Sequence, residues 1–552
     1  MRNLTERWLF VFRDHALPGN VEKSISLLPR AKAAGFNAIL LGDHNLLSID
    51  RKPESYRKDL VRLCEAIRGH GFRLIASCMP VGYAGSILAR DPNLAEGVPV
   101  KGARFVARGG ELHFEQDPPV SLVNGSFASS DGQRLDSWDS HIGLGETLFP
   151  EPGAAPGGGM AVRTEITEKP CQLSQPVKLQ PFRHYLIKVR TRIQDMDNRE
   201  GGEIVVRATD EQGRTRRLNY ACLRDLPTSD LPTSDWREQH AVFNSFRFTE
   251  ARVGIGTSSE GTGTVWWSDI SIEETALVNV LRRDGCPLTV HGEDGTEYQE
   301  GRDFEPIVDP LLNPMELYHT PPAVKLTSNT RIPEGAVVRI DYYHPLFIYG
   351  DQVCACLSDP KVLAIMRDQV VRLNDHIHPD AFLMAQDEMR SANSDAACLS
   401  RNMTPGQLMA DNIRQSAQII RDLRPDAKVW IWSDMIDPYH NAKDGPYYFV
   451  EGSWEGSWEG ADPDIGIANW AGHLKGKNCR WFADRGHQQI LSGYYDYDDD
   501  GAAIAAWLKS VEDVPGIVGA MHTSWQQKFD TIEAWAEKAW GRGPAGEGED
   551  DT

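Results

Sequence analysis

The sequence of 552 residues lacks the features that define several large classes of protein. Its nine cysteines are scattered from Cys64 to Cys479 without regular spacing, so we expect reduced thiols and neither a disulfide framework nor a zinc knuckle. No run reaches the roughly 18 apolar residues of a membrane span. Positive charge is also scarce, because 58 Lys and Arg stand against 79 Asp and Glu, which gives a net charge of −21. We therefore expect neither nucleic acid nor an anionic membrane as a partner.

The N-terminal residues contain neither the long apolar segment nor the small-residue cleavage site of a secretory signal. With the unpatterned cysteines, this predicts a cytoplasmic protein, or a secreted one whose signal peptide is not part of this sequence. Apolar residues make up 41% of the chain and charged residues 25%, which is typical of a soluble globular protein. A chain of this length predicts two or three domains.

Short apolar runs alternate with helical segments at both ends of the chain. Such runs predict strands that are buried on both faces of a parallel sheet. Three lie in the first hundred residues and five after residue 359, at positions 8–12, 37–41, 73–77, 381–385, 429–432, 465–468, 489–492 and 517–521. Eight strands alternating with helices predict a (β/α)₈ barrel (TIM barrel) of mixed α/β class, interrupted after its third strand. A doubly wound open sheet is the alternative.

The interruption has a different pattern, with short period-two strands between Gly, Asn and Asp turns. It predicts an all-β sandwich and then a smaller β-rich segment. The predicted organisation is barrel at 1–100, sandwich at 117–275, small segment at 276–341, barrel again at 342–545, and a disordered acidic tail at 546–552. The run VVRIDYYHP at 337–345 is either the last strand of the insertion or a barrel strand.

The ends of the inserted sandwich resemble those of carbohydrate-binding jelly-roll modules. The match consists of Asn124-Gly125-Ser126-Phe127 near its start and Trp267-Ser268-Asp269 near its end. Residues of this kind mostly build the sandwich, so the resemblance implies the fold more than sugar binding. The sandwich could equally brace the barrel or form a contact in a homo-oligomer.

Acids, amides and aromatics follow nearly every predicted barrel strand. Because the active site of such a barrel forms where strands end, we expect these side chains to meet. Carboxylates perform acid/base chemistry on glycosides, and aromatic faces stack on sugar rings, so the mixture predicts a carbohydrate substrate. The candidate substrate-binding residues are Arg13, Asp43, His44, Trp432, Asp434, Trp470, Tyr494, Tyr495, Asp496 and Trp525.

The pair Asp387-Glu388, after the fourth strand, is the candidate catalytic site. Adjacent carboxyl groups repel one another, so at least one pKa should rise, and a raised-pKa acid suits protonation of a glycosidic oxygen. An Asp-Glu dipeptide by itself is common and usually marks the solvated start of a loop. Its place at the end of a buried strand favours the catalytic interpretation.

The order of these residues resembles the family 20 β-N-acetylhexosaminidases. The shared elements are Asp387-Glu388, a Trp/Asp strand end at Trp432 to Asp434, a later Tyr-Asp, and a Trp after the eighth strand. The resemblance implies substrate-assisted catalysis on a 2-acetamido sugar, with Glu388 as general acid/base and Asp387 orienting the acetamido nitrogen. It further implies that Tyr494 or Tyr495 donates to the acetamido oxygen, that Asp496 binds a hydroxyl, and that Trp432, Trp470 and Trp525 wall the pocket.

Three alternatives remain open. A two-carboxylate glycosidase acting on a non-acetamido glycoside would need a second acid, for which Asp434, Asp496, Glu455 and Asp43 are candidates. A non-catalytic carbohydrate-binding protein would keep the aromatics alone. A metal-dependent hydrolase would need Asp43, His44 and another His to converge, but the histidine spacings match no established ligand pattern, so we expect no metal and no cofactor. The repeat EGSWEGSWEG at 451–460 is either a mobile lid or an exposed loop.

Overall fold

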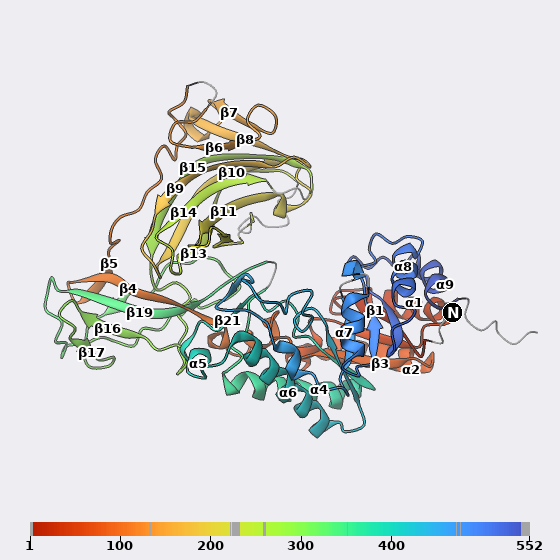
Figure 1. Cartoon of the computed structure of the whole chain (residues 1–552). Helices are drawn as coiled ribbons and strands as arrows, with labels where there is room; N and C mark the ends of the chain where they lie inside the picture. The colour runs from red at the N-terminus through yellow and green to blue at the C-terminus, as the bar shows by residue number, and fades with distance from the viewer. Residues whose placement is uncertain are drawn as a thin grey trace, which may run out of the picture. The chain divides into compact units, whose positions relative to one another are not determined.

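The computed structural model describes residues 4–131, 134–220, 222–223, 232–257, 261–349, 352–470, 472–474 and 476–541. The chain divides into two compact units, one made of 1–94, 354–393 and 398–552, the other of 95–353 and 394–397 (Figure 1). Within the described ranges, no helix combines the length and the apolar character needed to cross a membrane. The predicted disordered tail at 546–552 lies outside the described residues.

The first unit is built on a closed barrel of eight parallel strands. Strand β1 pairs with β2 on one side and with β26 on the other, which closes the sheet and excludes the open doubly wound alternative. All eight strands coincide with the predicted apolar runs. They are β1 (Glu6–Phe12), β2 (Ala38–Gly42), β3 (Arg73–Cys78), β20 (Ala381–Met384), β22 (Lys428–Trp432), β24 (Gly466–Asn469), β25 (Gln489–Leu491) and β26 (Ile517–His522).

Helices follow most of the barrel strands. Thr404 begins α6 with a reciprocal capping box, as its hydroxyl accepts from the Gln407 amide at 3.2 Å and its own amide donates to the Gln407 side chain at 3.0 Å. Between β22 and β24 the described chain has the short strand β23 (Phe449–Val450) and the 3-10 turn η6 (Ser457–Gly460), with no α-helix. The α-helices are α1 (Asn20–Ala33), α2 (Glu54–Gly69), α3 (Gly85–Leu88), α4 (Pro360–Ile377), α5 (Ala396–Leu399), α6 (Pro405–Leu423), α7 (Lys477–Ala483), α8 (Ala502–Ser510) and α9 (Ile532–Trp540).

Aromatic side chains fill the barrel interior. Trp8 and Trp430 meet edge to face with ring centroids 4.9 Å apart. Gly466 makes room for Trp430, because a Cβ at this position would lie 2.2 Å from the indole ring. Phe10, Trp432 and the inward aliphatic residues of the other strands complete the layer. The barrel is therefore a packed core that forms a rigid floor beneath the strand ends.

The second unit contains three antiparallel sheets. Two have five strands, in the orders β13-β10-β15-β8-β7 and β12-β11-β14-β9-β6, and the third has six, in the order β17-β16-β19-β4-β5-β18. The strands are β4 (Gly97–Arg108), β5 (Glu111–Phe114), β6 (Ser140–Ile142), β7 (Leu148–Pro152), β8 (Met160–Ile166), β9 (Cys171–Lys178), β10 (His184–Gln194), β11 (Gly202–Thr209), β12 (Thr215–Arg217), β13 (Ser234–Asn244), β14 (Glu250–Thr257), β15 (Gly263–Thr275), β16 (Thr289–Gly292), β17 (Glu297–Tyr298), β18 (Val324–Lys325) and β19 (Val337–Pro345).

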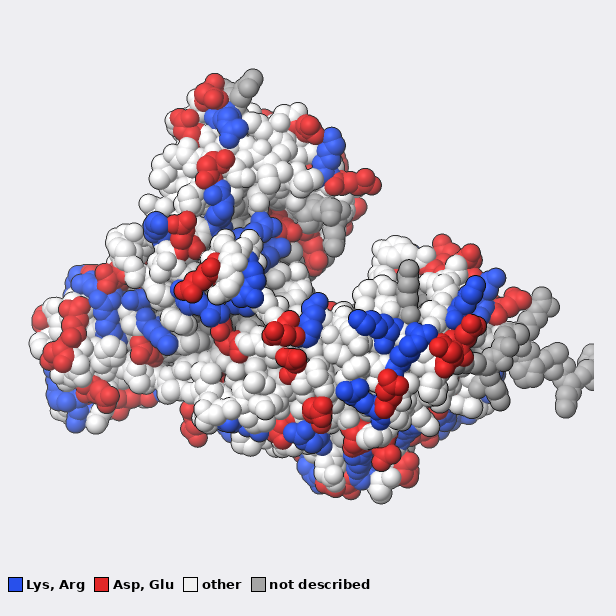
Figure 2. Space-filling view, in the orientation of Figure 1, with Lys and Arg blue, Asp and Glu red and all other residues white. Residues whose placement is uncertain are grey.

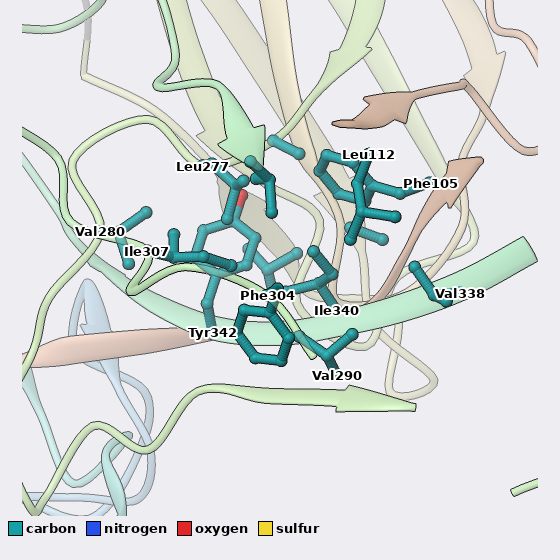
Figure 3. Close-up of a cluster of buried hydrophobic side chains, with 14 of the residues drawn as sticks. Phe105, Leu112, Leu277, Val280, Val290, Phe304, Ile307, Val338, Ile340 and Tyr342 are labelled. Carbon is teal, nitrogen blue, oxygen red and sulfur yellow. The ribbon is translucent and has the colours of Figure 1, made fainter. Parts of the chain in front are cut away.

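The six-stranded sheet answers the question left open by VVRIDYYHP. This run forms β19, which pairs with β4 and β16 and so belongs to the inserted part, not to the barrel. The predicted boundary at residue 100 falls inside β4. Buried side chains from these strands and the following loops pack together, among them Phe105, Phe304 and Tyr342 (Figure 3).

The jelly-roll motif residues hold the sandwich together. The Asn124 side chain donates to the carbonyls of Ser129 and Asp136 at 2.8 and 2.9 Å. The Trp138 indole donates to the Asn124 carbonyl at 3.1 Å, and its ring packs on Phe127 with centroids 5.4 Å apart. These contacts bring the start of the sandwich together, which is a structural use of the motif.

Candidate active site

Three carboxyl groups gather at the ends of β20 and β22. The amide of Glu388 donates to the Asp434 carboxylate at 3.0 Å, which joins the two loops. Glu388 has a left-handed backbone, with φ of 47°, a conformation that non-glycine residues adopt rarely and often at functional sites. Gly82, after β3, allows the Asp387-Glu388 turn to pack against the β3 loop, because a Cβ at this position would lie 2.0 Å from the Asp387 carbonyl oxygen.

The Glu388 carboxylate is held from two sides. The Tyr83 hydroxyl donates to Oε2, and the Arg390 guanidinium lies 2.8 Å from Oε1. The Arg390 guanidinium also lies 4.7 Å from the ring centroid of Tyr448. The Glu388 side chain remains 37% exposed, so a substrate can reach it.

Burial perturbs the two neighbouring acids. Burial, and then the charge of Glu388, raises the pKa of Asp387 to about 6. Burial, and then the charge of Asp387, raises the pKa of Asp434 well above its ordinary range. The Oδ1 atom of Asp434 is buried without a hydrogen-bond partner among the described residues. Asp387 and Asp434 therefore keep their protons to a higher pH than an aspartate in water does.

An aromatic cluster lies at the ends of the next barrel strands. The Trp470 ring centroid is 5.8 Å from that of Trp432, 6.3 Å from Trp525 and 6.4 Å from Tyr494, all in edge-to-face arrangements. Trp525 also contacts Phe12 at 5.0 Å. The predicted tryptophans thus form one continuous cluster, and the side chains of Trp525 and Tyr494 are exposed.

Two candidates after β25 have supporting positions. Asp496 is fully buried and accepts from the Ser524 hydroxyl at 2.5 Å, the Trp525 amide at 2.9 Å and the Gln526 amide at 3.2 Å. Its oxygens hold the loop after β26 and are not open to a sugar hydroxyl. Tyr495 is buried against Trp535 of α9, with ring centroids 5.1 Å apart. Of the two adjacent tyrosines, the one that lies in the aromatic cluster is Tyr494.

Of the two candidates after β2, Asp43 makes hydrogen bonds inside the protein and His44 is exposed. Asp43 is buried and accepts from the ring of His15 at 3.1 Å, the Tyr56 hydroxyl at 3.0 Å and the Asn45 amide at 2.8 Å. Burial would raise its pKa, but the hydrogen bonds from His15, Asn45 and Tyr56 hold the pKa below its ordinary value. His44 is exposed and its ring packs on Phe12. Among the described residues, neither Asp43 nor His44 belongs to a group of His, Cys, Asp and Glu side chains close enough together to hold a metal.

Arg13 hydrogen-bonds the last member of a buried chain formed by Asp43, His15 and Ser24, which resembles a catalytic triad in its geometry. The Ser24 hydroxyl lies 3.0 Å from Nε2 of His15, whose Nδ1 lies 3.1 Å from Asp43, as in a Ser-His-Asp triad. Ser24, however, is 1% exposed, and Arg13 donates to its hydroxyl at 3.1 Å. No substrate can reach this serine. The hydrogen-bonded chain therefore attaches the loop after β1, which carries His15, to Ser24 of α1.

The tryptophan-rich loop at 451–460 packs on α6 and does not form a lid. Trp454 is fully buried. A Cβ at Gly406 would lie 1.9 Å from the carbonyl of Glu455, and a Cβ at Gly460 would lie 2.4 Å from the carbonyl of Ala410. Backbone contacts this close are fixed parts of the fold, which corrects the alternative of a mobile lid.

Sequence reasoning missed Tyr83 and Arg390. The third barrel strand ends in Cys78-Met79-Pro80, which offers no polar signal, and Tyr83 reaches Glu388 from 305 positions away in the sequence. Arg390 lies two residues beyond Glu388. Its guanidinium provides a cation within an otherwise acidic cluster, and that cation could have been noticed from its spacing alone.

The chain matches no protein-family model and no curated protein. The solved structures that are similar to parts of this chain include carbohydrate-binding modules and a rhamnosidase. A family 16 carbohydrate-binding module is 16% identical over 27% of this chain and 97% of the module, with a TM-score of 0.21. A xylan-binding domain from Paenibacillus barcinonensis is 12% identical over 29% of this chain and 95% of the domain, with a TM-score of 0.21.

The rhamnosidase from Novosphingobium sp. PP1Y is similar over 95% of this chain and 55% of its own, at 11% identity and a TM-score of 0.32. This chain thus spans about half the length of that enzyme. Likenesses at this level do not assign the chain to a family.

The close approach at Gly82 gives a direct test of the site's backbone. Gly82→Ala would push the new methyl group into the Asp387 carbonyl and displace the Asp387-Glu388 turn. Since a shift of about 1 Å can cost about 100-fold in rate, kcat/KM should fall by roughly that factor. Gly69→Ala is the matched control, because nothing lies within 4 Å of a Cβ there. Equal activity of the two variants would contradict the role of this turn.

Proposed function

We propose that the chain is a glycoside hydrolase that acts on the terminal 2-acetamido sugar of its substrate, with the catalytic pair Asp387-Glu388. The observation that carries the proposal is the partly exposed Glu388 carboxyl beside a half-buried Asp387 whose pKa is raised to about 6. A substrate can thus reach Glu388, and Asp387 beside it can accept a hydrogen bond from the substrate once it ionises. The tryptophan cluster on the neighbouring strands supplies apolar surfaces for a sugar ring.

In this mechanism Glu388 is the general acid and base. The substrate's acetamido oxygen attacks the anomeric carbon while Glu388 protonates the departing glycosidic oxygen, which gives an oxazolinium ion and a free alcohol. Glu388 then takes a proton from the water that opens the ring at the same carbon. The Asp387 carboxylate accepts the acetamido N–H during both steps, and Tyr494 donates to the acetamido oxygen.

The positions of the other candidate acids favour the substrate-assisted mechanism over the two-carboxylate mechanism. Asp43 and Asp496 use their oxygens in internal hydrogen bonds. Glu455 belongs to the loop packed on α6. Asp434 hydrogen-bonds the amide of Glu388 itself and so lies on the same side as the acid. These placements support a mechanism in which the acetamido group of the substrate is the nucleophile.

The surface charge is compatible with a neutral sugar as substrate. On the face shown in Figure 2, acidic and basic side chains of the described residues are interspersed, whereas phosphate backbones require an extended basic patch.

A panel of aryl glycosides tests the proposal. The wild-type protein should hydrolyse a 2-acetamido glycoside and leave the corresponding plain hexoside intact. Its rate should fall along a series of mono-, di- and trifluorinated acetamido groups, because fluorine weakens the acetamido oxygen as a nucleophile. Hydrolysis of a plain hexoside with no acetamido substrate would exclude substrate assistance and favour the two-carboxylate alternative. No hydrolysis of any glycoside would contradict the glycosidase proposal.

A further inference from the structure

Exposed aromatic side chains are concentrated at one end of the barrel. Among the described residues, the large aromatics with substantial exposure are Tyr83, Tyr494, Tyr497 and Trp525. All four stand in the loops that follow β3, β25 and β26. Tyr497 is 75% exposed, the most of any large hydrophobic residue in the described chain. The mechanism above makes no use of it.

Tyr497 is held in position, although it is exposed. The Gln526 side-chain amide donates to the hydroxyls of Tyr494 and Tyr497 at 3.4 and 3.2 Å. The two tyrosine rings lie 5.8 Å apart at an interplanar angle of 46°. The Lys528 ammonium lies 4.9 Å from the Tyr497 ring centroid and donates to the Asp496 carbonyl at 2.9 Å. The ring is therefore oriented before any ligand arrives, which lowers the entropy lost on binding.

The loops that carry these residues are anchored beneath. Asp496 ties them together through the Ser524 hydroxyl and the Trp525 amide. Tyr495 packs into the protein against Trp535. Side chains along this loop thus divide into two sets, with Tyr494 and Tyr497 outward and the two residues between them inward.

The aromatic surface leads outward from the tryptophan cluster. Trp470 contacts both Trp525 and Tyr494, and Tyr494 in turn contacts Tyr497. Exposure rises along this path, from the half-buried Trp470 to the 75% exposed Tyr497. A ligand that binds at the tryptophan cluster and extends beyond it would pass over Tyr497.

We propose that Tyr497, with Tyr494 and Gln526, is a stacking site for a second sugar ring, so that the substrate is an oligosaccharide or glycan. The inference rests on the proposed function. Each ring carries a hydroxyl at its rim, with an amide and an ammonium beside it, which suits a ligand that has apolar ring faces and hydroxyl edges. A protein partner would favour a continuous apolar patch, and here Gln526 and Lys528 interrupt it.

Calorimetry on Glu388→Gln protein tests the stacking site without turnover. The probes are N-acetylglucosamine, N,N′-diacetylchitobiose, N-acetyllactosamine and cellobiose. At least one disaccharide should bind about tenfold more tightly than N-acetylglucosamine, and the additional Tyr497→Ala substitution should remove that gain. Tyr497→Phe, which keeps the ring, should retain it.

A gain that survives Tyr497→Ala, or no gain for any disaccharide, would overturn the stacking site. Failure of the proposed function would look different. In that case wild-type protein would hydrolyse no glycoside, while the Tyr497-dependent preference for a disaccharide would persist.

Discussion

Replacing Glu388 with glutamine should lower kcat/KM for an aryl 2-acetamido glycoside by roughly 10³-fold, the usual contribution of a positioned general acid. Glutamine has the same size, and its carbonyl can still accept from the Tyr83 hydroxyl. It cannot release a proton to the leaving group, and it removes the carboxylate that faces Arg390. The loss should therefore appear in kcat, as measured by release of nitrophenol under saturating substrate.

The identity of the leaving group separates an acid role from a structural one. A dinitrophenyl leaving group departs without protonation. With that substrate, the rate of oxazolinium formation in Glu388→Gln should therefore return to near the wild-type rate. Glu455→Gln, which alters an exposed acid in the loop packed on α6, is the matched control and should keep wild-type rates. An equal loss with both leaving groups would show that Glu388 does not act as an acid.

Replacing Asp387 with asparagine should stabilise the protein at neutral pH while removing activity. The folded-state pKa of about 6 lies above the ordinary value of 3.8, so the folded state binds more protons than the unfolded state between these values. Stability is therefore lost as pH rises from about 4 to 6, and above 6 the ionised Asp387 costs on the order of 3 kcal/mol. Urea unfolding should show Asp387→Asn to be more stable by this amount at pH 7.5.

Ionisation of Asp387 also sets the direction in which stability and kcat/KM change with pH. At pH 3 the wild-type carboxyl is protonated in the folded state and largely so in the unfolded state, so the stability gain of Asp387→Asn should disappear. The kcat/KM of the wild type should rise as pH rises through about 6, because the mechanism needs the ionised Asp387 carboxylate to accept the acetamido N–H. Asp464→Asn, which changes an exposed aspartate on the outer loop before β24, should leave both profiles unchanged. A wild-type rate that falls as pH rises through 6 would contradict the need for an ionised Asp387.

Much of the barrel could be predicted because its signals are local. Continuous apolar runs mark strands buried on both faces, and the Thr404-Pro405 start of α6 is a capping signal within four residues. VVRIDYYHP could also have been resolved. Its burial alternates along most of β19, and that period-two pattern belongs to a sheet with one solvated face, not to a parallel barrel strand.

The site could be predicted only in part, because the roles of its residues depend on tertiary partners. The sequence places Asp43, Asp434 and Asp496 alike at strand ends. Only the fold distinguishes Asp434, which has a buried oxygen without a partner among the described residues, from the other two, whose oxygens meet internal donors. Tyr83 escapes prediction for the same reason, since its contact with Glu388 spans 305 residues.

A crystal structure of Glu388→Gln protein soaked with a 2-acetamido disaccharide tests the claim that the acetamido sugar binds at Asp387 and Glu388. We expect a sugar ring between the substituted side chain at position 388 and the cluster of Trp432, Trp470 and Trp525. The acetamido N–H of that sugar should lie on Asp387, and its glycosidic oxygen should face position 388. A sugar bound only on the inserted sandwich, with the barrel mouth empty, would contradict the claim.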